Sequence, residues 1–158
     1  MTEFQRVGQL RQVSFDFKIE PRIPRYVPPE LAGYGYELLI LSGVPDDRYM
    51  SALVWFIEAE INKDLDLLGR VLNYDGMNIE DISLGPDFGK AEFLVYPAVQ
   101  LMPAAHELPS GFMHVLIATY VTRSEMNYSI ENGRKPLIDR LKSSGFGQLS
   151  IPGRKSVV

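Results

Sequence analysis

Two histidines and a set of carboxylates are the residues of this chain whose chemistry could support catalysis. His106 and His114 are the only histidines among its 158 residues. A histidine and a carboxylate that share one pocket can work as general acid and base, as in hydrolases. A zinc site needs three or four closely spaced ligands, which two histidines in a chain without cysteine do not supply. We therefore expect no metal site, and we keep a carboxylate and histidine hydrolase of unknown substrate as an alternative function.

Two glycine-containing stretches resemble nucleotide-binding loops only in outline. Residues 33–35, GYG, lack the third glycine of a dinucleotide-binding loop, and they precede a predicted strand where such a loop would follow one. Residues 85–90, GPDFGK, lack the spacing and the hydroxyl residue of a phosphate-binding loop. The serines have no G-x-S-x-G pattern around them. These patterns favour turns, so we predict no cofactor and no catalytic residue.

Acidic side chains gather in one region together with the only tryptophan. They are Glu58, Glu60, Asp64 and Asp66, and Trp55 lies close by. The simplest interpretation is a solvated helix face, with the tryptophan packed at an edge of the core. The functional alternative is an acidic docking face for a basic partner, because complementary charge steers association and tryptophan is enriched at binding hot spots.

The N-terminal half predicts two strands and one long helix. Residues 13–20, VSFDFKIE, alternate between apolar and polar as a half-buried strand does. Prolines and glycines in residues 21–35 predict a loop, and residues 36–43 predict an inner strand. Asp46 or Asp47 can cap a helix over about residues 47–72, whose apolar stripe should cover the sheet. The stripe consists of Met50, Leu53, Val54, Ile57, Ile61, Leu65, Leu68 and Leu72.

The C-terminal half predicts a buried pair of strands. Residues 90–102 and 112–122 are apolar enough to be buried on both faces, and the loop between them allows a hairpin. Pro97 indicates that the first of these strands ends there or lies at an edge. The turn-rich residues 73–89 leave room for one short strand.

Two short helices are predicted next. Thr122 and Glu125 have the spacing of a capping box, in which the hydroxyl and the carboxylate each accept a backbone N–H. Gly133 is typical of a helix end, and Pro136 suits the first turn of a second helix that ends at Gly145. The last residues, SIPGRKSVV, are polar and basic, and we expect a frayed tail.

The whole chain is the size of one α+β domain, residues 1–158. We predict a mixed, largely antiparallel sheet covered by one long amphipathic helix and two short C-terminal helices. The net charge of −4 argues against nucleic-acid partners, which attract basic surfaces. The absence of cysteine, of an apolar leader and of any apolar run of about 18 residues predicts a cytoplasmic protein without membrane association.

Three segments together resemble a known family. They are LAGYGYELLI, the predicted long helix with Trp55, and the run from FMHVLIATYV to KPLIDRL. In their order along the chain and in their residues, they resemble the suppressor of fused domain in its short bacterial form, over residues about 28–145. The closest matches are Gly35, Tyr36, Glu37, Leu38, Thr122, Glu125, Gly133, Leu137 and Ile138.

The resemblance implies a non-enzymatic protein-binding domain of mixed α and β structure. Bacterial relatives are associated with immunity proteins that neutralise toxins, so the resemblance implies a basic toxin as partner. A third hypothesis is a self-associating structural domain, in which exposed aromatic residues form a homodimer.

Overall fold

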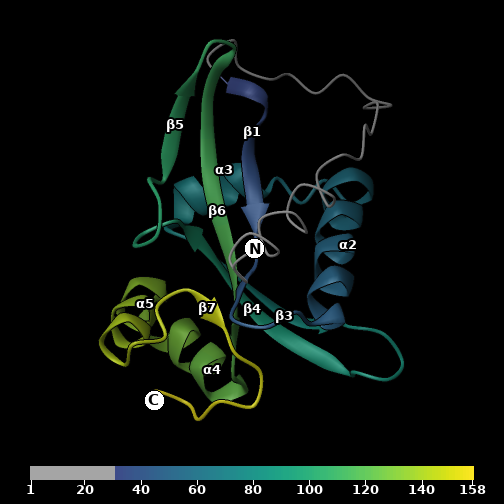
Figure 1. The fold of residues 1–158 in the computed structure, drawn as a ribbon, viewed down its shortest axis with the longest axis vertical. Coiled ribbons are helices and arrows are strands. Elements are labelled where there is room, and N and C mark those ends of the chain that lie inside the picture. Colours follow the sequence, from purple (N-terminus) through teal and green to yellow (C-terminus); the bar gives the residue numbers. More distant parts are fainter. Residues whose placement is uncertain (1–30) are drawn as a thin grey trace, which may run out of the picture.

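A mixed, mostly antiparallel sheet with helices on both faces forms this α+β protein, as the sequence predicts (Figure 1). The structure is a computed structural model and describes residues 31–158. The strand predicted at residues 13–20 lies outside the described residues. The elements are β1 (Leu31–Leu39), β2 (Leu41–Ser42), α2 (Asp47–Asn62), α3 (Leu67–Tyr74), β3 (Met77–Ser83), β4 (Lys90–Pro97), β5 (Ala105–Leu108), β6 (Gly111–Val121), α4 (Arg123–Asn132), α5 (Arg134–Ser143) and β7 (Leu149–Ser150).

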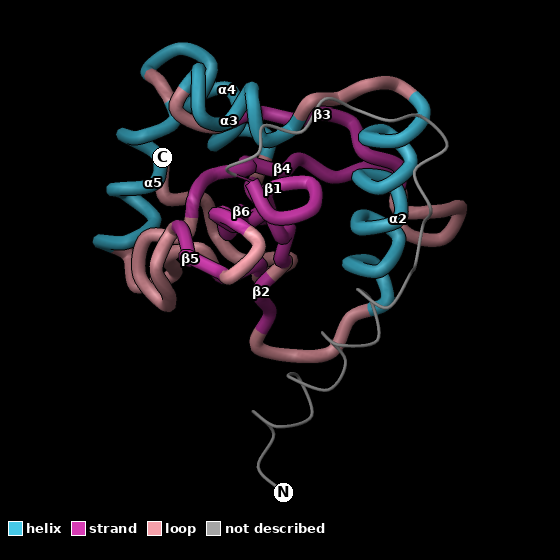
Figure 2. The backbone as a smooth tube through the Cα atoms, turned by 90° about the horizontal axis from the view of Figure 1, so that it is seen from above, coloured by secondary structure: helices cyan, strands magenta, loops and turns pink. Residues whose placement is uncertain are grey.

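The long strand β6 organises the sheet. One side of β6 pairs with β1 in parallel, and the other side pairs antiparallel with β5 and then with β4. The edge strand β3 pairs antiparallel with β4, which gives the order β1-β6-β4-β3. The sheet is curled, and helices flank it on both sides (Figure 2).

Alternate residues of the central strands build separate cores on the two faces of the sheet, because successive side chains of a strand point to opposite faces. Phe93 and Val95 of β4 belong to a core that includes residues of α2 and α3. Leu94 and Tyr96 of the same strand belong to a core with residues of α4 and α5. All but the ends of β4 are buried, which confirms that this strand is covered on both faces.

Several strand predictions are confirmed and two are corrected. The predicted pair of buried strands is antiparallel, the first of them ends at Pro97, and β3 is the short strand expected before them. The loop predicted between them contains β5, which adds to β6. The predicted loop over residues 21–35 extends too far, because β1 begins at Leu31 and accommodates its two glycines through a register shift before Tyr36.

The prediction of one helix over residues 47–72 is wrong. Helix α2 ends at Asn62, and α3 begins at Leu67. Between them, Asp64 and Asp66 have φ angles of 52° and 49°, in the left-handed region that stops a right-handed helix. Glu60 supports the new start, because its carboxylate accepts the backbone N–H of Leu67 at 3.2 Å. Aspartate tolerates this conformation better than most residues, so the break follows from the local sequence.

The C-terminal helices follow the sequence signals closely. Thr122 and Glu125 form the predicted capping box at the start of α4. Gly133, with a φ angle of 93°, ends α4 and precedes α5, and Pro136 lies in the first turn of α5. The capping side chains, the positive φ angle at Gly133 and the ring of Pro136 all act locally, which explains why their spacing alone predicts the helix ends.

Gly35 offers a test of how β1 packs on α3. Its φ angle is +81°, and an added Cβ would lie 2.8 Å from Leu31 Cδ1 and 3.0 Å from Leu68 Cδ2. We expect Gly35→Ala to lower the free energy of unfolding by about 2 kcal/mol or more, since left-handed backbone strain alone costs about 1–2 kcal/mol. Urea denaturation measures the change. The matched control is Gly43→Ala, which meets no atom within 4 Å and should change stability by less than about 0.5 kcal/mol.

Candidate functional site

The two histidines do not share a pocket with one another. In the antiparallel pair of β5 and β6, His114 lies opposite Ala105 and His106 lies opposite Met113. Directly opposed residues point to the same face of a sheet, and neighbouring residues point to opposite faces. His106 and His114 therefore project from opposite faces of the sheet.

The buried carboxylate Glu92 lies far from both histidines. Burial raises its pKa, and the nearby Arg123 guanidinium opposes this increase. Glu92 pairs with Val121, seven residues along β6 from His114, which corresponds to about 23 Å of strand. A hydrolase that combines Glu92 with His114 would need these groups within about 3 Å or one water molecule. This geometry does not support that combination.

Arg123 connects the carboxylates around Glu92. Its guanidinium lies 2.6 Å from Glu92 Oε1, 2.9 Å from Glu80 Oε1 and 3.0 Å from Asp81 Oδ1. Asp81 stands in the left-handed region at the irregular point of β3, and its backbone N–H donates to Glu92. This cluster therefore holds a bulge of the edge strand in place. Among residues 31–158, no group of three or more histidine or carboxylate side chains has the arrangement of a metal site.

The outer face of α2 carries several exposed apolar side chains. The helix packs on the sheet through Tyr49, Ala52, Phe56 and Ala59, and only these residues of α2 are buried. The predicted apolar stripe lies mostly elsewhere. Met50 is 47% exposed, Val54 49% and Ile61 41%, and Ile57 is partly exposed.

These four apolar residues form one continuous line, which we call the outer stripe: Met50, Val54, Ile57 and Ile61. At about 100° per residue they lie within about 60° of one another around the helix axis, roughly 150° from the centre of the buried face. The line is about 16 Å long at 1.5 Å per residue. The prediction that the stripe covers the sheet is therefore wrong for these four residues, whereas Leu53 and Leu65 pack against the core and Leu68 is buried in it. Helix α2 has two apolar faces.

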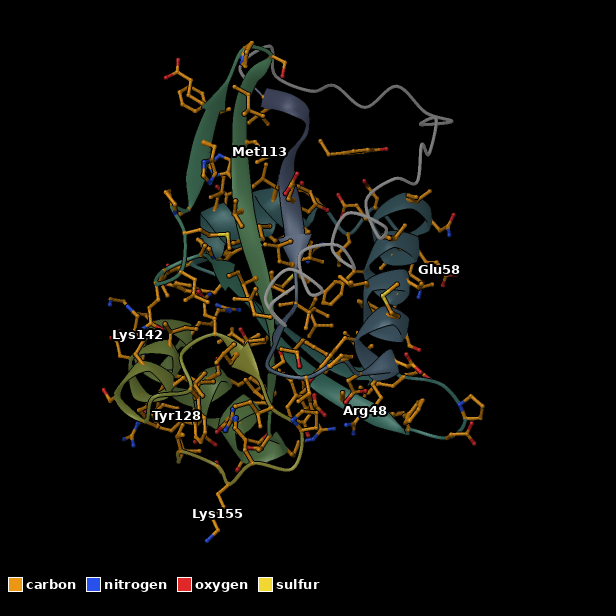
Figure 3. The ribbon with its side chains drawn as sticks, in the orientation of Figure 1. Arg48, Glu58, Met113, Tyr128, Lys142 and Lys155 are labelled. Atoms are coloured by element: carbon orange, nitrogen blue, oxygen red, sulfur yellow. The ribbon has the colours of Figure 1, made fainter. Side chains whose placement is uncertain are left out.

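Acidic side chains border the outer stripe on both flanks. Asp47 and Glu58 lie on one flank, and Glu60 lies on the other. Figure 3 shows Glu58 on the side of α2 that faces away from the sheet. Arg48, the only basic residue of α2, is paired with Asp46 at 2.5 Å. The bordering charge on this helix is therefore negative.

The structure places the predicted partner-binding residues in different roles. Glu58 is exposed at the flank of the stripe, whereas Glu60 also caps α3. Asp64 and Asp66 are exposed in the turn after α2. Trp55 is partly buried against the core, edge to face with Phe56 at 5.4 Å, with Lys63 Nζ 5.9 Å from its ring centroid. Sequence reasoning missed the outer stripe because tyrosine and alanine at the buried positions gave a weaker apolar signal.

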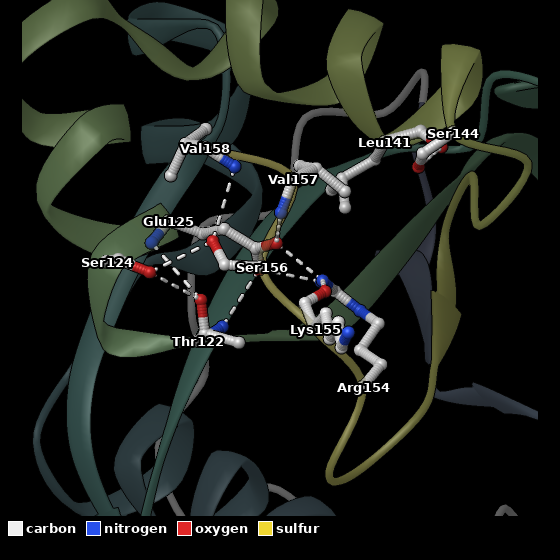
Figure 4. Close-up of polar contacts among 10 residues, drawn as sticks. All are labelled: Thr122, Ser124, Glu125, Leu141, Ser144, Arg154, Lys155, Ser156, Val157 and Val158. Carbon is white, nitrogen blue, oxygen red and sulfur yellow. Dashed lines mark hydrogen bonds and ion pairs between the residues drawn. The ribbon is translucent and has the colours of Figure 1, made fainter.

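A buried ion pair near the end of the chain is the second unusual site (Figure 4). Glu125 is 0% exposed, and its two carboxylate oxygens accept the Nη1 and Nη2 groups of Arg154 at 2.5 and 2.6 Å. The backbone N–H groups of Val157 and Thr122 also donate to it, each at 2.9 Å. The predicted frayed tail is therefore wrong for residues 154–157, which side-chain contacts hold in place.

The ionisation of Glu125 should make the free energy of unfolding depend on pH. Burial alone would raise the pKa of Glu125, but the hydrogen bonds from Arg154, Thr122 and Val157 outweigh burial and lower it from the ordinary value of 4.5. A pKa that is lower in the folded state stabilises the fold above the unfolded pKa, and this stability is lost as pH falls through the folded pKa. We expect stability measured by urea denaturation to fall below about pH 4.5, and to fall less steeply in Glu125→Gln.

Comparison of the chain with protein-family models, curated proteins and solved structures finds no match. The resemblance to the suppressor of fused domain therefore stays a prediction. Within residues 31–158, every helix is too short or too polar to span a lipid bilayer.

Proposed function

We propose that this chain is a non-enzymatic protein-binding domain and that the outer stripe of α2 is its docking surface. The exposed apolar line with acidic flanks carries the proposal. A helix face that does not contact the core gains nothing for folding from Met50, Val54 and Ile61. Apolar residues at i, i+4, i+7 and i+11 form the pattern by which one helix face binds an apolar partner surface.

Charge identifies the kind of partner. The chain has a net charge of −4, and the stripe is flanked by Asp47, Glu58 and Glu60. A second copy of the chain would bring like charges together along this face, which costs free energy. The proposed partner is a different protein that presents apolar side chains flanked by lysine or arginine.

The resemblance to bacterial suppressor of fused proteins suggests a biological role for this binding. It supports a cytoplasmic immunity protein whose partner is a basic toxin. Neutralisation of that toxin would require only complex formation, which agrees with a site built from apolar and acidic side chains. The alternatives are a hydrolase and a self-associating domain, and the experiment below separates self-association from binding of a different protein.

Substitution of the outer stripe should abolish partner binding without harming the fold. The experiment captures proteins from native cell extract with the tagged wild-type chain and with the tagged double variant Val54→Ser/Ile61→Ser. Mass spectrometry identifies the captured protein. The complex is then rebuilt from purified components, and its dissociation constant is measured. We expect a stoichiometric basic protein, with a dissociation constant at least about tenfold higher for the variant, because central apolar contacts are commonly worth more than 1 kcal/mol. Glu58→Lys should also weaken binding, and the loss of affinity should be larger at low salt than at high salt.

Ile130→Ser is the matched control, since Ile130 is 56% exposed but lies on α4. This control should bind like the wild type. Equal binding by the stripe variant would contradict the proposal. A doubled mass in analytical ultracentrifugation that the stripe variant abolishes would assign the stripe to self-association. A large decrease in the melting temperature of the isolated stripe variant would show that the stripe is covered within the same chain.

A further inference from the structure

Residues 154–158 contact the domain in the way that a bound peptide contacts its receptor. This segment contains no helix or strand and follows β7, the last element of the fold. Side chains of the domain provide most of its anchors. Glu125 binds the guanidinium of Arg154 and the backbone N–H of Val157, and Ser124 Oγ lies 2.9 Å from Ser156 Oγ.

Each of these contacts recognises a different chemical feature of the segment. The two parallel hydrogen bonds from Arg154 fit a guanidinium and not an ammonium group. The ring of Phe146 lies 5.0 Å from the centre of that guanidinium and adds a cation–π contact. Three residues later, Val157 packs against the apolar core between α4 and α5. The surface thus selects arginine at the first position and a small apolar residue at the fourth.

Glu125 has more acceptor capacity than its helix requires. Its capping role uses one hydrogen bond, from the backbone N–H of Thr122 to Oε2. The other three hydrogen bonds come from Arg154 and Val157. Without the segment, water could solvate both oxygens and the capping box would remain intact. The segment can therefore leave and return without dismantling α4.

We infer that Glu125, Phe146 and the adjoining core of α4 and α5 form a binding site for a short Arg-x-x-Val peptide, and that residues 154–157 occupy it as an internal ligand. A peptide with the same pattern from outside the chain competes for the site when the internal segment leaves. The site is independent of the outer stripe, because α2 packs on the other face of the sheet and the stripe points away from that sheet.

The test supplies the peptide separately to the full chain with its own anchor removed. Isotope-labelled Arg154→Ala is titrated with the acetylated and amidated peptide Gly-Arg-Lys-Ser-Val-Val. We expect saturable shifts of the amide signals of Thr122 and Glu125, and a rise in melting temperature that grows with peptide concentration. In Arg154→Ala without peptide, the Val157 amide should exchange with solvent at least about tenfold faster than in the wild type.

Three controls define the specificity. A peptide with alanine in place of arginine should not bind, and a peptide with lysine there should bind at least about tenfold more weakly. The double variant Arg154→Ala/Glu125→Gln should not bind the arginine peptide. If Arg154→Ala does not fold, Arg154→Lys takes its place with the same readouts. Unchanged protection of the Val157 amide in the folded variant, or equal binding of the alanine and arginine peptides, would overturn the inference.

Discussion

Replacing Glu125 with glutamine should lower the free energy of unfolding by about 3 kcal/mol. Removing one partner of a buried ion pair typically costs about 3–5 kcal/mol, because the other charge stays buried without compensation. Glu125 is 0% exposed, and the Arg154 side chain is 3% exposed. We expect the lower end of that range, since Arg154 can move into water together with residues 154–158. Urea denaturation followed by circular dichroism measures the loss.

The surface pair of Lys135 and Asp139 provides the control for this prediction. Their side chains are 65% and 54% exposed and lie 3.2 Å apart on one face of α5. Exposed pairs of this kind contribute about 0.3–0.5 kcal/mol, so Asp139→Asn should have a small effect. A loss below about 1 kcal/mol in Glu125→Gln would mean that the buried pair contributes little beyond its desolvation cost. That result would leave the capping box of α4 as the main role of Glu125.

Features encoded by neighbouring residues could be predicted from the sequence. The capping box depends on the two side chains of Thr122 and Glu125 and on nearby backbone groups, and the helix end at Gly133 depends on a positive φ angle that glycine tolerates. The strands β4 and β6 could be predicted because burial on both faces leaves long apolar runs. The loop between them allows a hairpin, and the two strands do pair antiparallel.

Features decided by distant contacts could not be predicted in this way. The parallel pairing of β1 with β6 joins segments about 80 residues apart, and no turn signal marks it. The docking of residues 154–157 depends on Glu125, which already had a sufficient explanation as a capping residue. A polar, basic sequence gives no apolar signal for such docking, because most of its anchors are hydrogen bonds.

The orientation of α2 is the most instructive error for the candidate site. Its strongest apolar pattern faces outward, and the residues that pack on the sheet include two alanines and a tyrosine. Hydrophobicity ranks isoleucine and valine above alanine, but close packing of a helix on a sheet favours small side chains beside large aromatic ones. The acidic residues are a visible signal in the sequence, whereas the apolar pattern between them predicts a face that packs on the core.

Phe56→Ala should destabilise the isolated chain by about 3–5 kcal/mol, whereas Val54→Ala should cost less than about 0.5 kcal/mol. Phe56 is 2% exposed, and its ring lies edge to face against Phe93 at 6.0 Å and against Trp55 at 5.4 Å. Removing the ring leaves a cavity between α2 and the sheet and breaks both aromatic contacts. Val54 is 49% exposed and belongs to the outer stripe, so its methyl groups contribute little to the isolated fold.

Urea denaturation of the two variants side by side decides how α2 is oriented. If the apolar stripe covered the sheet, as the sequence pattern predicts, Val54→Ala would carry the larger cost and Phe56→Ala would be mild. A large loss in Phe56→Ala alone supports the buried face of Tyr49, Ala52, Phe56 and Ala59. The outer stripe is then free of a folding role, and its apolar residues require another explanation. The partner-binding proposal offers one, because docking of another protein would remove this exposed apolar line from water.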